Sequence, residues 1–484
     1  MSEKSIAKEI YKGTFWSILD NFVKQVFTFI VFIVLARLLA PEIIGLLAFA
    51  MLFVQVFRNV IFDSIATAIV RKSVPDKTDY NTGFVLCILI SVPAFIILFL
   101  SSDLFETWTN SMGLSTVIKG TSFILLTAGL SRMHEAWLQH QMNFKSLAIR
   151  SSVATFFGGV LGIILAYKNF GIYSLVAQQV GTALLELILI WIVTPWKPKF
   201  EFSYQAFREI KSYGKHVALT GLTNFANQNS DSFFVTYYLG AAANGIYSTG
   251  KRIVSTLNTV ISASLLRVSL PAFARIKDNT EELKNTFLQT TGITATLTAP
   301  LFAGLSILSK DITLLLLGDK WLESAYVMQI VTLTGFLFSI GYYNQSVMLV
   351  KNKPQWQTRL TILYALTNIA AFILFTKYGV IYTALAFSLR ALLLYPLSVW
   401  CSLVLLKCSF KEYFRQLFPS LAATALMVIL IYFLSLYIST LSLTIRLVIL
   451  IFTGILSYLF FIYLFIPKSY KNKLKKVFAR KKHD

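Results

Sequence analysis

Long apolar stretches recur along the whole chain, and each is long enough to cross a lipid bilayer as a helix. About 20 residues at a rise of about 1.5 Å per residue cover a hydrocarbon core of about 30 Å. Hydropathy predicts about fourteen such spans, near residues 14–37, 43–70, 81–101, 116–136, 147–167, 171–194, 216–239, 245–270, 284–306, 323–349, 357–376, 380–406, 416–437 and 443–466. The sequence therefore predicts an all-α integral membrane protein.

The composition excludes an ordinary soluble protein. Of the 484 residues, 56% are hydrophobic and only 14% are charged, and the mean hydropathy is +0.67. A soluble domain carries about 25% charged residues. The net charge of +22 could indicate nucleic-acid binding, but the Lys and Arg residues lie mainly between the apolar runs and at the C-terminal end. We therefore expect no nucleic-acid partner.

The loops between the predicted spans alternate between a basic set and a set with few Lys and Arg residues. Cytoplasmic loops of membrane proteins carry an excess of Lys and Arg, so we expect the basic set in the cytoplasm. Both ends of the chain are basic, which places both termini in the cytoplasm and requires an even number of spans. No outer loop exceeds about 15 residues, close to ordinary connection lengths, which leaves no room for an outer catalytic domain.

The first twelve predicted spans fall into two sets of six, separated by the longest internal linker. Similar Leu-to-Gly segments follow the first span (39–45) and the seventh span (239–245), which indicates related halves. Parallel six-helix halves with a substrate site between them are a known transporter plan. We predict an amphipathic helix at 1–13, an N-lobe at 14–194, the linker at 195–215, a C-lobe at 216–406, two further spans at 407–466 and a basic tail at 467–484.

Polar side chains form stripes at helical spacing on corresponding spans of the two predicted halves. Charge at membrane depth usually faces a bundle interior or a watery cavity, so we predict that the stripes border one central hydrated cavity. The alternative is that these groups only hold the helices together through interhelical hydrogen bonds. The candidates for substrate binding are Lys24, Arg58, Lys251, Arg252, Arg390, Asn21, Asn59, Asn224 and Asn258. The candidates for ion coupling are Asp63, Asp231 and Glu186, and no partner for Glu186 is evident in the sequence.

The predicted cavity carries both signs of charge, with several cations among them. An anionic phosphate group favours Arg and Lys, and Arg can contact two oxygens at once. An exporter of organic cations would favour an acidic, aromatic pocket, so the charge balance favours an anionic headgroup. The sequence contains no P-loop, no dinucleotide-binding loop and no pair of His residues at zincin spacing. We expect no enzymatic activity, no cofactor and no metal.

Several segments together resemble the polysaccharide flippases of the Wzx type, which belong to the multidrug/oligosaccharidyl-lipid/polysaccharide exporter superfamily. The resemblance runs along the whole chain and includes the two extra spans at its end. It is carried by residues 35–42 with Gly45, by the run 231–240, by 245–248 with Lys251 and Arg252, and by the stretch 264–275. In such relatives, cationic residues of the lobe interface meet the pyrophosphate and the sugar. The matching positions here are Lys24, Arg58, Lys251 and Arg252.

This resemblance implies two six-helix lobes with alternating access and a function in surface polysaccharide or lipopolysaccharide synthesis. The implied substrate is an undecaprenyl-pyrophosphate-linked oligosaccharide repeat unit, carried across the bacterial cytoplasmic (inner) membrane. The implied partners are membrane lipids, a coupling ion (H⁺ or Na⁺) and the polysaccharide polymerase machinery. Three alternatives remain open: a multidrug or organic-cation antiporter of the same superfamily, a lipid II flippase, and a membrane polymerase or ligase. The last usually needs a sizeable outer loop, and none is visible in the sequence.

Overall fold

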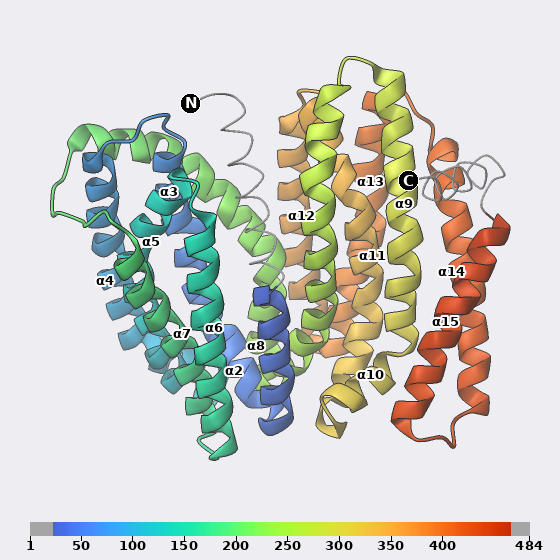
Figure 1. Cartoon of the computed structure of the whole chain (residues 1–484). Coiled ribbons are helices and arrows are strands. Elements are labelled where there is room, and N and C mark those ends of the chain that lie inside the picture. The colour runs from blue at the N-terminus through green and yellow to red at the C-terminus, as the bar shows by residue number, and fades with distance from the viewer. Residues whose placement is uncertain (1–22, 466–484) are drawn as a thin grey trace, which may run out of the picture. The chain divides into compact units, whose positions relative to one another are not determined.

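The computed structural model describes residues 23–465, apart from the side chains of residues 262–268 in one helix. The predicted amphipathic helix at 1–13, the basic tail at 467–484 and the candidate Asn21 lie outside the described residues. Within that part of the chain, helices follow one another with short connections and no strand is present (Figure 1). The prediction of an all-α membrane protein is confirmed.

A helix over residues 23–38 comes first among the described residues. It is followed by α2 (Pro41–Val56), the π-helix η1 (Phe57–Phe62), α3 (Asp63–Val70), α4 (Lys77–Thr109), α5 (Leu114–His140), α6 (Phe144–Tyr167), α7 (Ile172–Val193), α8 (Tyr204–Arg275), α9 (Thr280–Ile307), α10 (Ser309–Leu316), the 3-10 helix η2 (Asp319–Trp321), α11 (Leu322–Val350), α12 (Pro354–Phe375), the 3-10 helix η3 (Thr376–Tyr378), α13 (Val380–Leu406), α14 (Phe410–Tyr437) and α15 (Leu443–Phe465).

Eleven helices of the described region are long and apolar enough to cross a membrane. The predicted first span corresponds to the helix over residues 23–38, whose described part is short. The predicted seventh and eighth spans both fall within α8, where polar residues lower the hydropathy. At Gly240 the backbone of α8 takes φ 82° and ψ 177°, so two helices meet at this one residue. The loop predicted between these spans is thus reduced to a single residue, because glycine tolerates a positive φ without a steric penalty.

Short-range sequence signals explain where several helices begin. Pro41 stands in the first turn of α2, where its missing N–H costs no hydrogen bond. Asp76 and Asp79 form a capping box at the start of α4, and Ser409 and Glu412 form another at the start of α14. Each box satisfies backbone N–H groups that the first helical turn leaves unpaired.

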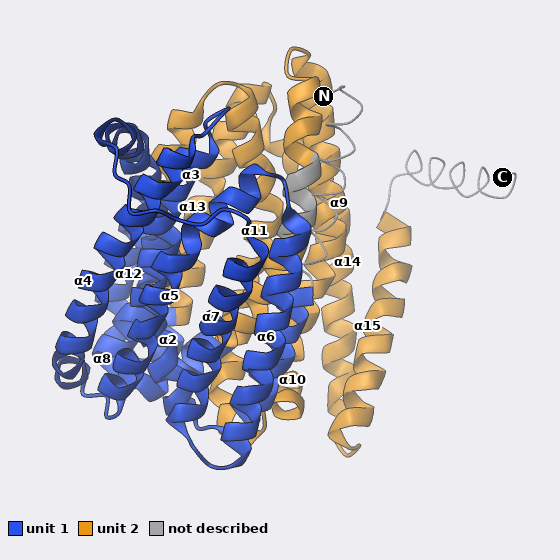
Figure 2. Cartoon of the chain, turned by 60° about the vertical axis from the view of Figure 1, so that its left-hand side comes forward, with its two compact units in different colours: residues 1–249, 361–383 blue, residues 250–360, 384–484 orange. Residues whose placement is uncertain are grey.

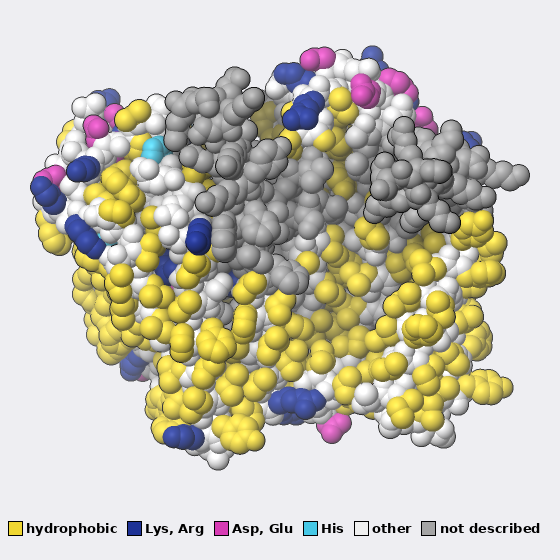
Figure 3. Space-filling view, viewed as in Figure 1, with side chains coloured by type: hydrophobic (Ala, Val, Ile, Leu, Met, Phe, Trp, Pro, Cys, Tyr) yellow, Lys and Arg dark blue, Asp and Glu magenta, His cyan; other side chains and the backbone are white. Residues whose placement is uncertain are grey.

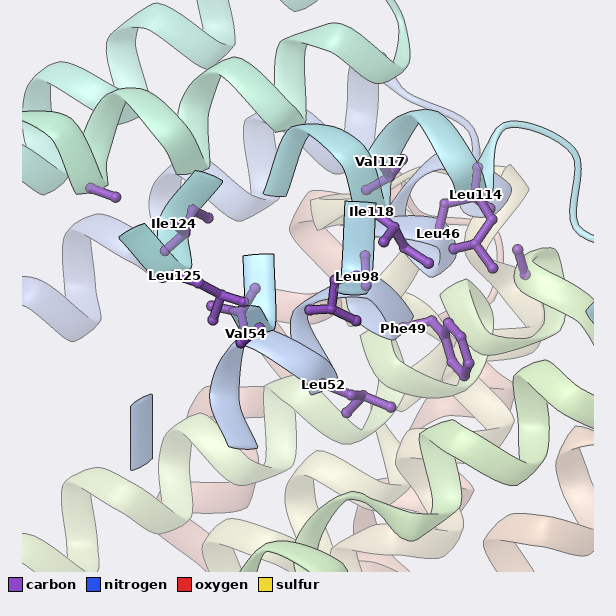
Figure 4. Packing of buried hydrophobic residues seen from close by; sticks show 14 residues of the cluster. Leu46, Phe49, Leu52, Val54, Leu98, Leu114, Val117, Ile118, Ile124 and Leu125 are labelled. Atoms are coloured by element: carbon purple, nitrogen blue, oxygen red, sulfur yellow. The ribbon is translucent and has the colours of Figure 1, made fainter. Parts of the chain in front are cut away.

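One compact unit comprises residues 1–249 and 361–383, and Figure 2 shows it in blue. In this unit α4 packs on α5, α6 packs on α7, and α5 also packs on α7. One core cluster joins α2, α4 and α5 through residues such as Phe49, Leu98 and Leu125 (Figure 4). A second cluster gathers Tyr80, Trp196 and neighbouring side chains around the ends of α3, α4 and α5. The core thus fixes the helices that carry the charged residues described below.

The Leu-to-Gly segments that follow the predicted first and seventh spans lie against each other inside this unit. A Cβ on Gly45 would lie 1.8 Å from the Ala241 carbonyl oxygen, and one on Gly245 would lie 1.9 Å from the Pro41 carbonyl oxygen. Asn244 Nδ2 also donates a hydrogen bond to the Gly45 carbonyl oxygen over 3.2 Å. The backbones of α2 and α8 therefore cross at a distance that only glycine permits.

The other unit comprises residues 250–360 and 384–484. In this unit α9 packs on α11 and α14, and α14 packs on α15. Hydroxyl pairs link helices within its core: Thr294 Oγ1 lies 2.7 Å from Tyr343 Oη, and Thr334 Oγ1 donates to Ser388 Oγ over 3.0 Å. Such pairs are typical of helix packing in membranes. The predicted lobes group helices by order and pseudo-symmetry, whereas these units group them by packing, so the lobe boundaries stay a prediction.

Apolar side chains point outward along the helices of both units. On the face shown in Figure 3, hydrophobic side chains cover the helical surfaces, whereas charged side chains gather toward the helix ends. Leu89, Ile97, Phe157 and Ile188 are each more than half exposed, although each stands within a candidate membrane span. Outward-facing apolar side chains in these spans suit contact with lipid tails. The chain is therefore a multi-pass membrane protein.

Candidate functional site

A cluster of charged side chains lies inside the first unit, and helices from distant parts of the sequence contribute to it. Its seven members are Lys24 from the helix over residues 23–38, Arg58 from η1, Asp63 from α3, Arg132 and Glu135 from α5, Arg150 from α6, and Glu186 from α7. We refer to these seven residues as the charged cluster. Burial of charge within a membrane protein requires pairing or contact with water, and each member of the cluster is paired with an opposite charge.

One part of the charged cluster is tightly paired. Arg132 contacts Asp63 over 2.7 Å and Glu135 over 2.6 Å, and Arg150 contacts the other oxygen of Glu135 over 2.8 Å. Glu135 and Arg150 are largely buried. These distances are those of charge-assisted hydrogen bonds. The four residues thus form a chain of ion pairs that joins α3, α5 and α6, as structural ion pairs do.

The other part is loosely paired around Glu186. Its carboxylate oxygens lie 3.8 Å from Lys24 Nζ and 3.6 Å from an Arg58 guanidinium nitrogen. Both distances exceed those of a hydrogen bond. The side chain of Glu186 is 9% exposed, whereas those of Lys24 and Arg58 are 44% and 39% exposed. The two cations therefore neutralise a buried carboxylate while large parts of their own side chains remain accessible.

A cavity of about 160 Å³ lies beside both parts of the cluster. The second span contributes Arg58, Asn59 and Asp63 to its lining. Thr127, Ser131, Arg132 and Glu135 of α5 and Glu186 of α7 complete the polar lining. A space lined by so many charged and hydroxyl groups suits water or a polar ligand.

The π-helix η1 explains how Arg58 and Asp63 come to line the same cavity. In an α-helix, residues five positions apart point about 140° away from each other. In η1 the backbone N–H of Asp63 instead donates to the carbonyl oxygen of Arg58. This wider turn brings residues five apart onto one side of the helix, and π-turns occur frequently at functional sites.

The structure brings some of the predicted site residues together and separates others from them. Lys24, Arg58, Asp63 and Glu186 meet in the charged cluster, and Asn59 lines the same cavity. Asp231 lies elsewhere in this unit, where it is 1% exposed and accepts a hydrogen bond from Tyr247 Oη over 2.8 Å. Asn224 is exposed on the first half of α8.

The second unit holds the remaining candidates. Lys251 Nζ lies 5.3 Å from the centre of the Phe387 ring, and the Arg390 guanidinium lies 5.6 Å from the same ring centre. Both distances suit cation–π contacts. Arg252 is exposed, whereas Asn258 is buried and accepts a hydrogen bond from Ser339 Oγ over 3.3 Å. A ring flanked by two cations thus marks a second basic region, within the second unit.

Sequence reasoning missed three members of the charged cluster: Arg132, Glu135 and Arg150. Each stands inside a predicted span, where a charged residue is by default a candidate for function. Arg132 and Glu135 are three positions apart and so lie on one side of α5. Their partners Asp63 and Arg150 are far away in the sequence, and only the packing of α3, α5 and α6 brings them together.

Among the residues that the structure describes, no group of His, Cys, Asp and Glu residues is arranged to hold a metal ion. The carboxylates of the charged cluster are held by Arg and Lys side chains instead. The arrangement can bind an anion through its accessible cations, Lys24 and Arg58.

A family model described as "Polysaccharide biosynthesis protein" matches residues 34–326. The teichuronic acid biosynthesis protein TuaB of Bacillus subtilis is 25% identical over 98% of this chain and 99% of its own length. The succinoglycan biosynthesis transport protein ExoT of Rhizobium meliloti is 25% identical over 68% of this chain and 66% of its own. Among solved structures, the lipid II flippase MurJ in an inward closed conformation has a TM-score of 0.76 and 17% identity, covering 94% of this chain and 98% of that one.

Proposed function

Because the chain belongs to the polysaccharide biosynthesis protein family, we propose that it is a flippase for undecaprenyl-pyrophosphate-linked oligosaccharide repeat units. It is a membrane transporter of this family and not an enzyme. The substrate crosses by alternating access, with its polar headgroup inside the protein and its polyprenyl tail in the lipid. A protein named for succinoglycan transport and a lipid II flippase among the similar proteins support a lipid-linked sugar as the cargo.

The observation that carries this proposal is the pair of accessible cations, Lys24 and Arg58, beside a polar cavity. A pyrophosphate group offers several acceptor oxygens, and a guanidinium can contact two of them at once. Arg132, in contrast, is held by two carboxylates at hydrogen-bond distance. We assign the pyrophosphate to Lys24 and Arg58, and we assign Asn59 to the sugar hydroxyls next to them.

The basic region of the second unit supplies further candidate contacts for the headgroup in this proposal. Lys251, Arg252 and Arg390 supply further positive charge, and Phe387 offers an apolar face between two of them. Aromatic rings are also suitable surfaces for the apolar faces of sugar rings. Asn21, Asn224 and Asn258 remain candidates for hydrogen bonds to the glycan.

The remaining parts of the proposal concern location and partners. The membrane is the bacterial cytoplasmic (inner) membrane, with both termini in the cytoplasm, because the basic loops and both basic ends suit that orientation. The coupling ion is H⁺ or Na⁺, with Asp63, Asp231 and Glu186 as its candidate sites. The polysaccharide polymerase machinery, which acts on the translocated product, is the expected protein partner.

The test compares Arg58→Ala with Arg275→Ala in a strain deleted for its own copy of the gene. Arg275 is a matched control, because it is an exposed Arg at the end of α8 and outside the charged cluster. We expect Arg58→Ala to abolish surface polysaccharide and to accumulate lipid-linked repeat units in the cytoplasmic leaflet. Arg275→Ala should export normally. Normal export by Arg58→Ala at wild-type protein levels, with lost resistance to cationic drugs, would favour an organic-cation antiporter and contradict the proposal.

A further inference from the structure

We propose that Glu186 is an internal counter-ion that stands in for the charge of the substrate, and that it takes up one proton when the substrate displaces it. In the substrate-free protein it neutralises Lys24 and Arg58. When the diphosphate binds these two cations, the carboxylate of Glu186 loses its partners and becomes protonated from solvent. The inference rests on the proposed function, because it concerns the same cations and the same anionic headgroup.

The distances single out Glu186 among the carboxylates of the first unit. Asp63 and Glu135 each lie within 2.8 Å of an arginine nitrogen, at hydrogen-bond distance. Asp231 accepts hydrogen bonds from the Tyr247 hydroxyl and from the backbone N–H of Ser232. Glu186 alone among these four contacts its cations at 3.6 and 3.8 Å. Its ion pairs are therefore the weakest of the set and the easiest for another anion to replace.

The exposure of the side chains supports an exchange of partners. Lys24 and Arg58 have the accessible surface that an incoming anion needs, whereas Glu186 is 9% exposed. A phosphate can therefore contact the accessible parts of the two cations while Glu186 stays buried. Glu186 does not have to move for the exchange, because the flexible side chains of Lys24 and Arg58 can turn toward the new anion.

The charges of the cluster show why a proton should follow. Lys24 from the helix over residues 23–38 and Arg58 from η1 contact Glu186, Asp63 from α3 and Arg132 and Glu135 from α5 line the same cavity, and Arg150 from α6 is linked to them through Glu135. With Glu186 included, four cations face three carboxylates, which leaves one excess positive charge. A diphosphate diester brings one negative charge on each phosphoryl group. The occupied cluster then has one excess negative charge, and one proton restores neutrality.

Glu186 is the site in the occupied cluster where that proton is most stable. Burial disfavours the ionised form of a carboxyl group, and a second anion nearby disfavours it further. Asp63 and Glu135 keep their arginine partners in both states, so they gain no comparable reason to be protonated. The step forms one O–H bond on a carboxylate oxygen of Glu186, and it breaks no bond in the substrate. Release of the headgroup returns the cations to Glu186 and releases the proton.

Calorimetry on the purified full-length chain tests this directly. The probe is farnesyl-diphosphate-linked N-acetylglucosamine, a diphosphate diester, titrated at pH 7 in two buffers with different heats of ionisation. We expect the wild-type chain to take up about one proton per probe bound. Its affinity should fall as the pH rises, by as much as tenfold per pH unit. Glu186→Gln should bind at least as tightly as the wild type, take up no proton and show no pH dependence.

The outcomes separate this inference from its alternatives. If Glu186 only stabilises the fold, Glu186→Gln should bind more weakly and keep the wild-type proton number, which would overturn the inference. Wild-type binding without proton uptake would also overturn it, and that result needs no variant. A wild-type chain that does not bind the probe at all would contradict the proposed function itself. Glu201→Gln serves as the matched carboxylate control, since Glu201 lies outside the charged cluster, where it accepts a hydrogen bond from Asn81, and its loss leaves the charge balance of the cluster unchanged.

Discussion

Replacing one of the two buried carboxylates, Glu135 or Glu186, tests whether the charged cluster has a tightly paired structural part and a loosely paired part. Glu135→Ala leaves Arg150 in its buried position without the carboxylate that contacts it over 2.8 Å, and it takes one of two carboxylates from Arg132. Removing one partner of a buried ion pair costs about 3–5 kcal/mol. We expect a loss of that size in the free energy of unfolding.

Glu186→Ala is the matched comparison, because it removes a carboxylate of similar burial from the same cluster. Its partners Lys24 and Arg58 are about 40% exposed, lie beyond hydrogen-bond distance and can be solvated by water. Ion pairs of accessible side chains contribute about 0–1 kcal/mol. Glu186→Ala should therefore destabilise the protein by several kcal/mol less than Glu135→Ala.

Equilibrium unfolding of the purified proteins in mixed micelles measures this difference. Tryptophan fluorescence is a suitable signal, because Trp191 and Trp196 pack around His134, the neighbour of Glu135 on α5. Equal losses for the two variants, or a larger loss for Glu186→Ala, would refute the division of the cluster into a tight part and a loose part.

Two further predictions concern the frame around the site. Gly45→Ala should strongly reduce the yield of folded protein, because its Cβ would lie 1.8 Å from the Ala241 carbonyl oxygen. Gly304→Ala is the control, because nothing lies within 4 Å of the new Cβ. Equal yields of the two variants in a membrane-extraction assay would contradict the close crossing of α2 and α8. Lys72 contacts Asp79 and Glu209 over 2.6 Å each. Burial acts to lower the pKa of Lys72, but the hydrogen bonds to both carboxylates outweigh it and raise the pKa, while the hydrogen bond from Lys72 lowers the pKa of Glu209. The raised pKa of Lys72 adds to the free energy of unfolding, and this contribution is complete below about pH 10 and lost above it. The lowered pKa of Glu209 adds a second contribution, which is complete above about pH 4 and lost below it. The difference in melting temperature between wild type and Lys72→Met should thus stay constant from about pH 5 to 9, and a steep change within that range would contradict this reading.

Much of the fold could be predicted because membrane spans obey a simple length and polarity rule. The all-α architecture is confirmed, and the resemblance to polysaccharide flippases of the Wzx type is confirmed by the family match. The polar character of α8 was visible in the sequence as two spans rich in Asn and Ser. The sequence did not predict that the two helices of α8 meet at the single residue Gly240, because a glycine in a short segment between two spans is equally compatible with a longer loop.

The site could be predicted only in part, because its members are linked by packing. Arg58 and Glu186 were identifiable as charges at membrane depth, but their contact spans more than a hundred positions and depends on how η1 and α7 meet. The ion pair between Glu135 and Arg150 depends in the same way on how α5 and α6 pack. The assignment of roles to the candidate residues stays a prediction, which the export and binding experiments address.

The wide turn at Phe57–Phe62 gives the second span one residue more than its length as a regular helix would need. Each residue of an α-helix rotates the following side chains by about 100°. Deleting one position between Gly45 and Arg58 would therefore turn Arg58 and Asp63 together by about 100° relative to the helix crossing at Gly45, and so away from the cavity, without changing a single charge. The count of residues between Pro41 and Asp63 thus specifies the polarity of the cavity wall as strictly as the identity of the residues does.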